Sequence, residues 1–188
     1  MKIKEGRLPG VLIIEPDFFA DQRGYFMETW NSKKYTEFGI REEFVQDNIS
    51  FSTMGVLRGL HFQHPHGQGK LVYVLTGEVF DVVVDIRRYS PTFGMWEGFH
   101  LTAENKLQVY IPEGFAHGFC VTGKDTHFVY KCTEYYNPAT ESGILWSDPS
   151  INISWPFENP ILSDKDSKLP LLGEIQPDGL PSIGVNDE

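Results

Sequence analysis

The stretch KLVYVLTGEVFDVVVDI, residues 70–86, carries the clearest secondary-structure signal in the chain. Residues 71–76 and 79–86 are both rich in β-branched and aromatic side chains, and Gly77-Glu78 separates them. In the second run, one side of the alternation is entirely apolar, whereas the other mixes valines with Asp81 and Asp85. Two alternating β-rich runs joined by a glycine turn predict a β-hairpin with one fully apolar face.

Six further segments have a similar strand-like composition, and turn residues separate them. They are residues 10–14, 24–30, 44–52, 96–101, 107–111 and 126–135. One short helix is predicted over residues 33–38, with Asn31 or Ser32 as its N-cap and Gly39 just beyond its end. Many short strands with very little helix predict an all-β sandwich or barrel with a few short helices.

The length of 188 residues suits one domain with a hydrophobic core. We assign residues 1–169 to this single domain. Residues 170–188 contain Pro and Gly and are predicted to form a C-terminal tail that is extended or covers the body.

The formal net charge is −10, with 16 Lys and Arg against 26 Asp and Glu. Such an acidic chain has no general attraction for nucleic acids or anionic membranes, so we expect neither as a partner. Cys120 and Cys132 lie in apolar runs and form no CxxC pair. Because no apolar run approaches the roughly 18 residues of a membrane span, we expect a cytoplasmic protein with reduced thiols.

Four clusters of polar and aromatic residues lie outside this general pattern. The first is VLRGLHFQ, residues 56–63, which is followed by His64, His66 and Lys70. The others are IPEGFAHGF (111–119), YKCTEYYNP (130–138) and LSDKD (162–166). Each combines residue types that transfer protons or bind anions, and each therefore contains candidate site residues.

The first two clusters resemble the two signature regions of the cupin superfamily. Within it, the sequence resembles the dTDP-4-dehydrorhamnose 3,5-epimerase family. The resemblance rests on LRGLHF (57–62), VFDVVVDIR (79–87), SPTFG (90–94), AHGF (116–119) and WSDP (146–149), and it extends from about residue 10 to residue 166. It implies a cupin-type jelly-roll β-barrel or sandwich, with no cofactor and no metal, that forms a homodimer sharing N-terminal strands.

The implied reaction inverts C3 and C5 of dTDP-4-dehydro-6-deoxy-D-glucose to give dTDP-4-dehydro-L-rhamnose, a step toward dTDP-L-rhamnose and cell-surface polysaccharides. Both carbons lie next to the C4 ketone, so their protons can be removed through an enolate. Inversion needs a base on one face of the sugar, an acid on the other, and a positive group near the enolate oxygen.

The resemblance and the residue types together assign these roles. His61 is the predicted base, because imidazole accepts protons near neutral pH, and Asp166 is the carboxylate that orients it. Tyr130 is the predicted acid, since its side chain should point to the same, inward face of the strand as those of its apolar neighbours two residues away. Lys70 is predicted to stabilise the enolate. Each also has an ordinary structural alternative: a strand histidine, a buried core tyrosine, or a lysine in solvent at a strand end.

The resemblance also implies the residues that bind substrate. His117 is expected to contact the sugar, and the alternation of its neighbours suggests Asp81 as its partner. Tyr136 is expected to stack on thymine. The remaining contacts to the diphosphate and nucleotide are assigned to Arg23, Glu28, Gln46, Asp47, Asn48, Arg58, Glu141 and Lys165.

Other interpretations remain open. His64-Pro65-His66 provides the HxH pattern of metal-binding cupins, so a metal-dependent enzyme could use His61, His64 or His66, and His117. The proline and the lack of a nearby glutamate favour a loop at the mouth of the site instead. A sugar-binding cupin without catalysis, and a mono-epimerase or ketoisomerase acting on a related dTDP-4-keto sugar, are further alternatives.

Overall fold

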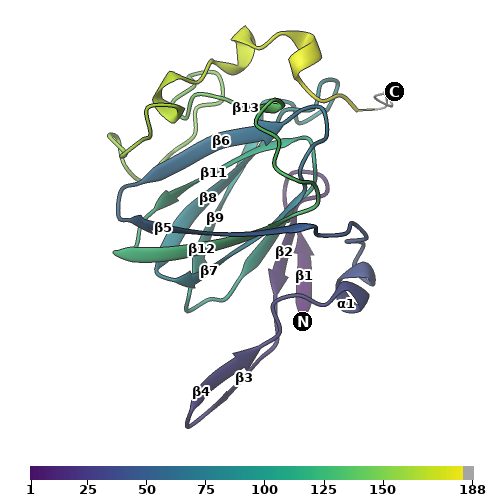
Figure 1. The fold of residues 1–188 in the computed structure, drawn as a ribbon, viewed down its shortest axis with the longest axis vertical. Helices are drawn as coiled ribbons and strands as arrows, with labels where there is room; N and C mark the ends of the chain where they lie inside the picture. Colours follow the sequence, from purple (N-terminus) through teal and green to yellow (C-terminus); the bar gives the residue numbers. More distant parts are fainter. Residues whose placement is uncertain (184–188) are drawn as a thin grey trace.

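The computed structural model describes residues 1–183 and contains two β-sheets packed face to face, with a two-stranded arm extending from them (Figure 1). The six-stranded sheet has the order β1 (Lys2–Glu5), β2 (Leu12–Glu15), β10 (Gln108–Ile111), β7 (Lys70–Thr76), β12 (Asp125–Cys132) and β5 (Gln46–Thr53). The five-stranded sheet has the order β13 (Glu141–Gly143), β6 (Leu57–Gln63), β11 (Phe115–Val121), β8 (Glu78–Asp85) and β9 (Trp96–Thr102). The arm consists of β3 (Phe18–Asp21) and β4 (Gly24–Met27).

The space between the two sheets holds the main hydrophobic core. Val72, Val74 and Phe128 enter it from the six-stranded sheet, and Val83 and Phe119 enter it from the five-stranded sheet. Burial of this apolar surface is the main force that holds the sheets together. The prediction of an all-β fold with a few short helices is confirmed, and within residues 1–183 the two sheets form a sandwich rather than a closed barrel.

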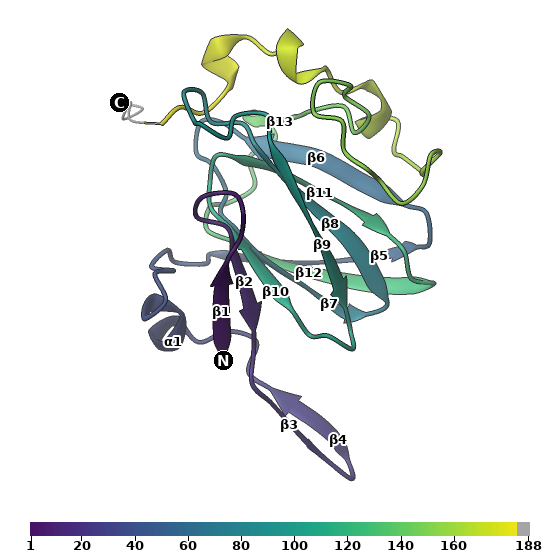
Figure 2. The same cartoon turned by 180° about the vertical axis from the view of Figure 1, so that it is seen from behind.

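The outer face of the five-stranded sheet is covered by the C-terminal part of the chain. Phe80, Val82 and Val84 point outward from β8 and pack with Leu172 and Leu180 in a second buried cluster. This segment includes the short 3-10 helices η1 (Asp166–Lys168), η2 (Leu172–Glu174) and η3 (Pro177–Gly179), and both views show it lying across the top of the sheet (Figure 2). Residues 184–188 of the predicted tail lie outside the described residues.

The hairpin predicted for residues 70–86 is wrong. Both runs are strands, but β7 pairs with β10 and β12, whereas β8 pairs with β11 and β9 in the other sheet. The chain changes sheet at Gly77, which has a φ of 78°. A side chain there would collide with Thr126 Oγ1 and would lie 2.8 Å from the Asp125 carbonyl oxygen. Glycine is therefore required at a corner between the sheets, not at a hairpin turn.

The other segments predicted as strands contain or overlap β2, β4, β5, β9, β10 and β12. The predicted helix is α1, which runs from Ser32 to Thr36, and the Oδ1 atom of its N-cap Asn31 accepts a hydrogen bond from Lys34 N. Helix α1 and the following residues cover part of the outer face of the six-stranded sheet, where Tyr35 and Ile40 pack on Leu71. None of the helices in the described part of the chain is long and apolar enough to cross a membrane.

The arm carries large apolar side chains that are exposed in the single chain. Phe18, Phe19, Tyr25 and Phe26 are 50–69% exposed. The arm projects away from both sheets (Figure 2). Monomeric proteins rarely leave so many large aromatic rings in contact with water on one short hairpin, so this surface is suited to contact another molecule.

Candidate active site

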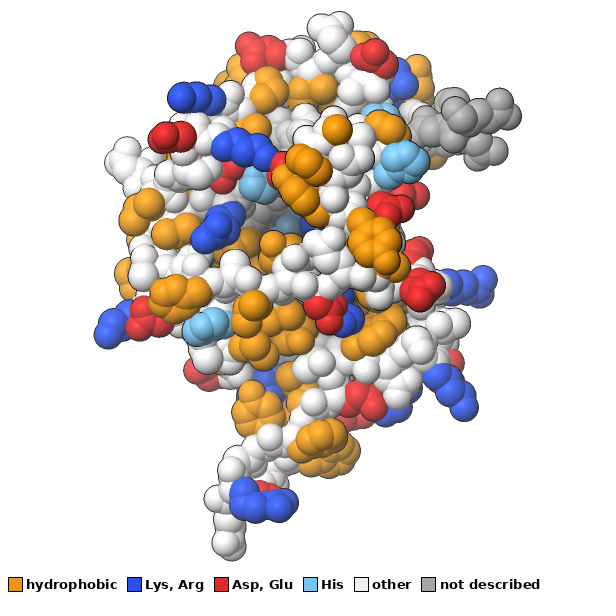
Figure 3. Space-filling model, in the orientation of Figure 1, with side chains coloured by type: hydrophobic (Ala, Val, Ile, Leu, Met, Phe, Trp, Pro, Cys, Tyr) orange, Lys and Arg blue, Asp and Glu red, His pale blue; other side chains and the backbone are white. Residues whose placement is uncertain are grey.

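A cavity of about 630 Å³ opens between the two sheets, and its lining brings together most of the residues predicted for the site. Figure 3 shows the hollow, with histidine and cationic side chains around it. Eleven predicted site residues line it: Gln46, Asn48, Arg58, His61, Lys70, His117, Tyr130, Tyr136, Glu141, Lys165 and Asp166. They come from strands of both sheets and from the C-terminal segment.

His61 and Asp166 form a hydrogen-bonded pair at this cavity. Asp166 Oδ1 lies 2.6 Å from His61 Nε2, although the two residues are 105 positions apart. His61 lies on β6, and Asp166 begins η1, where Ser163 Oγ accepts a hydrogen bond from the Asp166 backbone N. Because a carboxylate only accepts, Nε2 carries the proton of neutral His61 and Nδ1 keeps its lone pair.

The Asp166 carboxyl group is almost fully buried. Burial alone would raise its pKa, but the hydrogen bond and charge of His61 outweigh that effect, and the pKa is lowered. Gly59 N also lies 3.5 Å from Asp166 Oδ2 and adds to the stabilisation of the anion. The carboxylate is therefore ionised near neutral pH and is placed to stabilise a positive charge on the His61 ring.

Tyr130 lies on the opposite wall of the cavity from His61. It lies on β12 in the six-stranded sheet, whereas His61 belongs to the five-stranded sheet. Its ring packs beside Phe128, and both side chains line the cavity as the strand alternation predicted. Burial raises the pKa of the Tyr130 phenol, so the group carries its proton at neutral pH.

Lys70 begins β7, and its side chain points between the sheets. The residue is only 9% exposed, which excludes the alternative of a strand-end lysine in solvent. No hydrogen bond or ion pair to its ammonium is formed within residues 1–183, and its cross-strand neighbours are Cys132 and Ile111. Burial lowers the pKa of Lys70, and the nearby Cys132 and Glu141 partly oppose this. An ammonium without a partner in such a cavity can bind an anion.

A second histidine–carboxylate pair lies deeper between the sheets. His117 Nε2 is 2.7 Å from Asp81 Oδ2, so the contact suggested by the alternation is present. Asp81 is completely buried, and its Oδ1 atom has no hydrogen-bond partner within the described chain. The His117 ring stacks on Phe128, which fixes its plane at the cavity wall.

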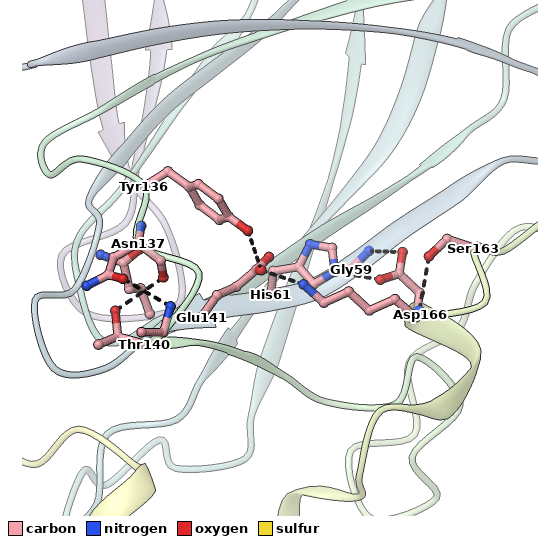
Figure 4. A network of polar contacts seen from close by, with 11 residues as sticks. Gly59, His61, Tyr136, Asn137, Thr140, Glu141, Ser163 and Asp166 are labelled. Atoms are coloured by element: carbon pink, nitrogen blue, oxygen red, sulfur yellow. Dashed lines mark hydrogen bonds and ion pairs between the residues drawn. The ribbon is translucent and has the colours of Figure 1, made fainter.

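Several predicted binding residues contact one another at the mouth of the cavity. Tyr136 N donates to Gln46 Oε1 at 2.9 Å, and Gln46 Nε2 donates to Asn48 Oδ1 at 3.1 Å. The Tyr136 hydroxyl donates to Glu141 Oε2 at 2.8 Å, and Lys165 forms an ion pair with the same oxygen. Figure 4 shows Tyr136 and Glu141 beside His61 and Asp166.

Three predicted binding residues do not line the cavity of the single chain. Arg23 is at the tip of the arm, is 89% exposed, and pairs with Asp21. Glu28 follows the arm and pairs with Lys34 at 2.8 Å. Asp47 points to the opposite face of β5 from its two neighbours, because side chains alternate along a strand, and it pairs with Lys131.

Other cavity residues were not predicted. Ser50 points to the same face of β5 as Asn48, and Cys132 points to the same face of β12 as Tyr130. The alternation of side chains along each strand could therefore have identified both. Leu162 and Ile161 also line the cavity, because residue 161 forms a parallel bridge with Val56. No local sequence signal indicates that long-range contact.

The predicted HxH pattern does not form a metal-type cluster. His66 lines a smaller neighbouring hollow, and neither His64 nor His66 lines the main cavity. Among residues 1–183, no three or more His, Cys, Asp or Glu side chains are grouped in a way that could hold a metal ion.

Comparisons with known proteins agree with the resemblance in the sequence. The family model described as dTDP-4-dehydrorhamnose 3,5-epimerase matches residues 5–174. A dTDP-4-dehydrorhamnose 3,5-epimerase from Shigella flexneri is 60% identical over 168 residues, which cover 88% of this chain and 93% of that protein. A dTDP-4-dehydrorhamnose 3-epimerase from Streptomyces niveus is 40% identical over 182 residues, covering 96% and 88% of the two chains.

A solved structure is also very similar. It is dTDP-6-deoxy-D-glucose-3,5-epimerase RmlC from Legionella pneumophila Philadelphia 1 in complex with dTDP-4-keto-L-rhamnose. It matches with a TM-score of 0.95 and 50% identity, and the match covers 98% of this chain and 99% of that chain. The likeness therefore extends to the whole fold as well as to the motifs.

Proposed function

We propose roles for individual residues because the chain belongs to the dTDP-4-dehydrorhamnose 3,5-epimerase family and is an isomerase of dTDP-rhamnose biosynthesis. The substrate is a dTDP-linked 4-keto-6-deoxyhexose that enters the cavity between the sheets. His61 Nδ1 removes the proton from C3 or C5, and Asp166 stabilises the imidazolium that results.

The electrons left on carbon move to the C4 oxygen, where the Lys70 ammonium stabilises the enolate. Tyr130 then delivers its proton to the same carbon from the other face. Each inversion leaves a protonated imidazole and a phenolate, and proton exchange with water restores both groups before the second carbon reacts. The observation that carries this proposal is the His61–Asp166 pair on one wall with Tyr130 on the other.

Solvent exchange tests the proposal directly. We expect that dTDP-4-keto-6-deoxyglucose incubated with the enzyme in D2O takes up deuterium at both C3 and C5, measured by NMR and mass spectrometry. His61→Ala should abolish the uptake at both carbons while dTDP still binds. Uptake by the His61→Ala variant at the wild-type rate would remove His61 from the role of base.

A mono-epimerase is the second candidate. The Streptomyces niveus relative is named a 3-epimerase, so this fold can serve an enzyme named for inversion at one carbon. The same experiment separates the two activities, because a mono-epimerase would exchange one position only. For the metal-dependent alternative, elemental analysis of protein purified without chelator is decisive, since stoichiometric iron, nickel or zinc would favour it.

We further propose that the working form is a homodimer in which arms are exchanged. Strand β5, which carries Gln46 and Asn48, is the last strand of its sheet, so its outer edge is open in the single chain. Open strand edges favour pairing with another strand. An arm from a second copy placed there would cover its exposed aromatic rings and bring Arg23 and Glu28 to the nucleotide end of the cavity. Function in the cytosol stays a prediction from the scarcity of cysteine and the lack of a long apolar run in the sequence.

A further inference from the structure

One carboxylate oxygen at the mouth of the cavity joins three separate segments of the chain. Glu141 Oε2 accepts the hydroxyl hydrogen of Tyr136 at 2.8 Å and also pairs with the Lys165 ammonium (Figure 4). The Glu141 side chain is only 17% exposed. This contact therefore connects β13, the loop that precedes it, and the C-terminal segment.

Both sides of this contact lead directly to the His61–Asp166 pair. On one side, β13 pairs with β6 so that Gly143 lies opposite His61. On the other side, Lys165 immediately precedes Asp166, whose carboxylate contacts His61. The ion pair thus joins β13, the neighbour of the strand that carries His61, to the C-terminal segment, one residue before the catalytic hydrogen bond.

The charges of the contact are stable at neutral pH. Burial raises the pKa of Glu141, but the hydrogen bonds from Lys165 and Tyr136 outweigh it, and the pKa is lowered. The hydrogen bond to Glu141 raises the pKa of Lys165. An exposed ion pair contributes little to overall stability, but one that fixes a segment by two donors can set the geometry of a neighbouring site.

We propose that Glu141 is a positioning residue that holds Asp166 against His61 and couples this pair to Tyr136, the side chain predicted to stack on thymine. The catalytic part of the inference rests on the proposed role of His61 as the base. Proton transfer requires donor and acceptor to be placed within fractions of an ångström, so a looser C-terminal segment would slow the reaction at full occupancy. The effect should appear mainly in kcat, and KM should change less.

The first experiment measures the ligand-free protein. Glu141→Gln keeps the shape of the side chain and an acceptor for Tyr136, but it removes the charge that holds Lys165. We expect amide hydrogen exchange of residues 163–168, followed by mass spectrometry, to become about threefold faster. Glu158→Gln is the matched control, because Glu158 is exposed and forms no hydrogen bond or ion pair within the described residues. Unchanged exchange of residues 163–168 in Glu141→Gln would overturn the proposal.

The second experiment compares kinetic constants for deuterium uptake. Glu141→Gln and Lys165→Met should each lower kcat about tenfold with a smaller change in KM, and the double variant should also lose about tenfold. A loss near a hundredfold in the double variant would mean two independent contacts with substrate and would refute the coupling. So would a rise in KM with kcat unchanged.

The two experiments separate this inference from the proposed function. If the wild-type enzyme fails to exchange C3 and C5, the proposed reaction fails. The hydrogen-exchange measurement still decides whether Glu141 holds the segment that carries Asp166, because it needs no substrate.

Discussion

At the scale of a single residue, the catalytic role proposed for Lys70 conflicts with the stability of the fold. Its ammonium is buried without a partner in the described chain, and burial lowers its pKa relative to the unfolded chain. A lysine with a lowered folded-state pKa makes the folded protein less stable at neutral pH than at alkaline pH. This cost disappears as the pH rises through the folded pKa toward the ordinary lysine value, because the unfolded chain then binds more protons.

Replacing Lys70 with methionine should therefore stabilise the protein while inactivating it. We expect Lys70→Met to raise the unfolding free energy by about 1 kcal/mol at neutral pH and Tm by about 2–4 °C. The stability difference from wild type should shrink between pH 7 and about pH 10. Deuterium uptake should fall about 10²- to 10³-fold, because the enolate loses its positive neighbour.

Thermal unfolding at several pH values and the exchange assay check this prediction. Lys124→Met is the control, since Lys124 is exposed and should change neither quantity. A lower Tm for Lys70→Met would show that the ammonium has a stabilising partner in the folded protein.

Much of the site could be predicted at this scale because strand alternation and motif resemblance are local signals. Alternation placed Tyr130 and Lys70 toward the interior and suggested the Asp81–His117 contact. It could also have excluded Asp47 from the cavity side of β5. The pairing of His61 with Asp166 depends on the whole fold, and only the resemblance indicated it.

At the scale of elements, the strands were easier to predict than their partners. Residues 70–86 contain two strands, but a hairpin and a corner between two sheets both require two β-rich runs separated by a left-handed glycine. Local composition therefore cannot distinguish them. The residues of β6 and β11 were identified as sequence motifs but not as strands, because glycines interrupt the alternation of apolar and polar side chains there. Gly59 and Gly118 meet there so closely that a Cβ atom on Gly59 would lie 2.6 Å from Gly118 Cα.

The corner at Gly77 gives a stability prediction. Gly77→Ala should lower the unfolding free energy by about 2–4 kcal/mol, because the alanine would be strained at positive φ and would overlap the backbone of β12. Gly173→Ala is the matched control, since its methyl group would meet no atom within 4 Å. Chemical denaturation of both variants measures the difference, and equal stabilities would contradict the role of the corner.

At the scale of the whole molecule, the single chain leaves its arm and one sheet edge without partners. Phe19 and Phe26 lie opposite each other on the arm, and each is 69% exposed. A second copy would bury both rings, and each buried ring would contribute about 1.5–3 kcal/mol to association. The proposed dimer therefore explains both the exposed arm and the distance of Arg23 from the cavity.

The double variant Phe19→Asp/Phe26→Asp should sediment as a monomer and bind dTDP at least tenfold more weakly, although its cavity is unchanged. Tyr89→Asp, which changes a 77% exposed ring elsewhere, should leave the sedimentation coefficient as in wild type. Analytical ultracentrifugation and calorimetry provide the measurements. A dimer with normal dTDP affinity in the arm variant would refute the exchange of arms.

The separation of 105 residues between His61 and Asp166 also has a consequence during translation. A chain growing from its N-terminus exposes the histidine long before its carboxylate partner is synthesised. Nascent polypeptides shorter than 166 residues therefore lack the assembled base, even if both sheets have begun to form. Epimerisation would begin only after residue 166 has emerged from the ribosome, so enzymatic activity would report on chains that extend past this residue.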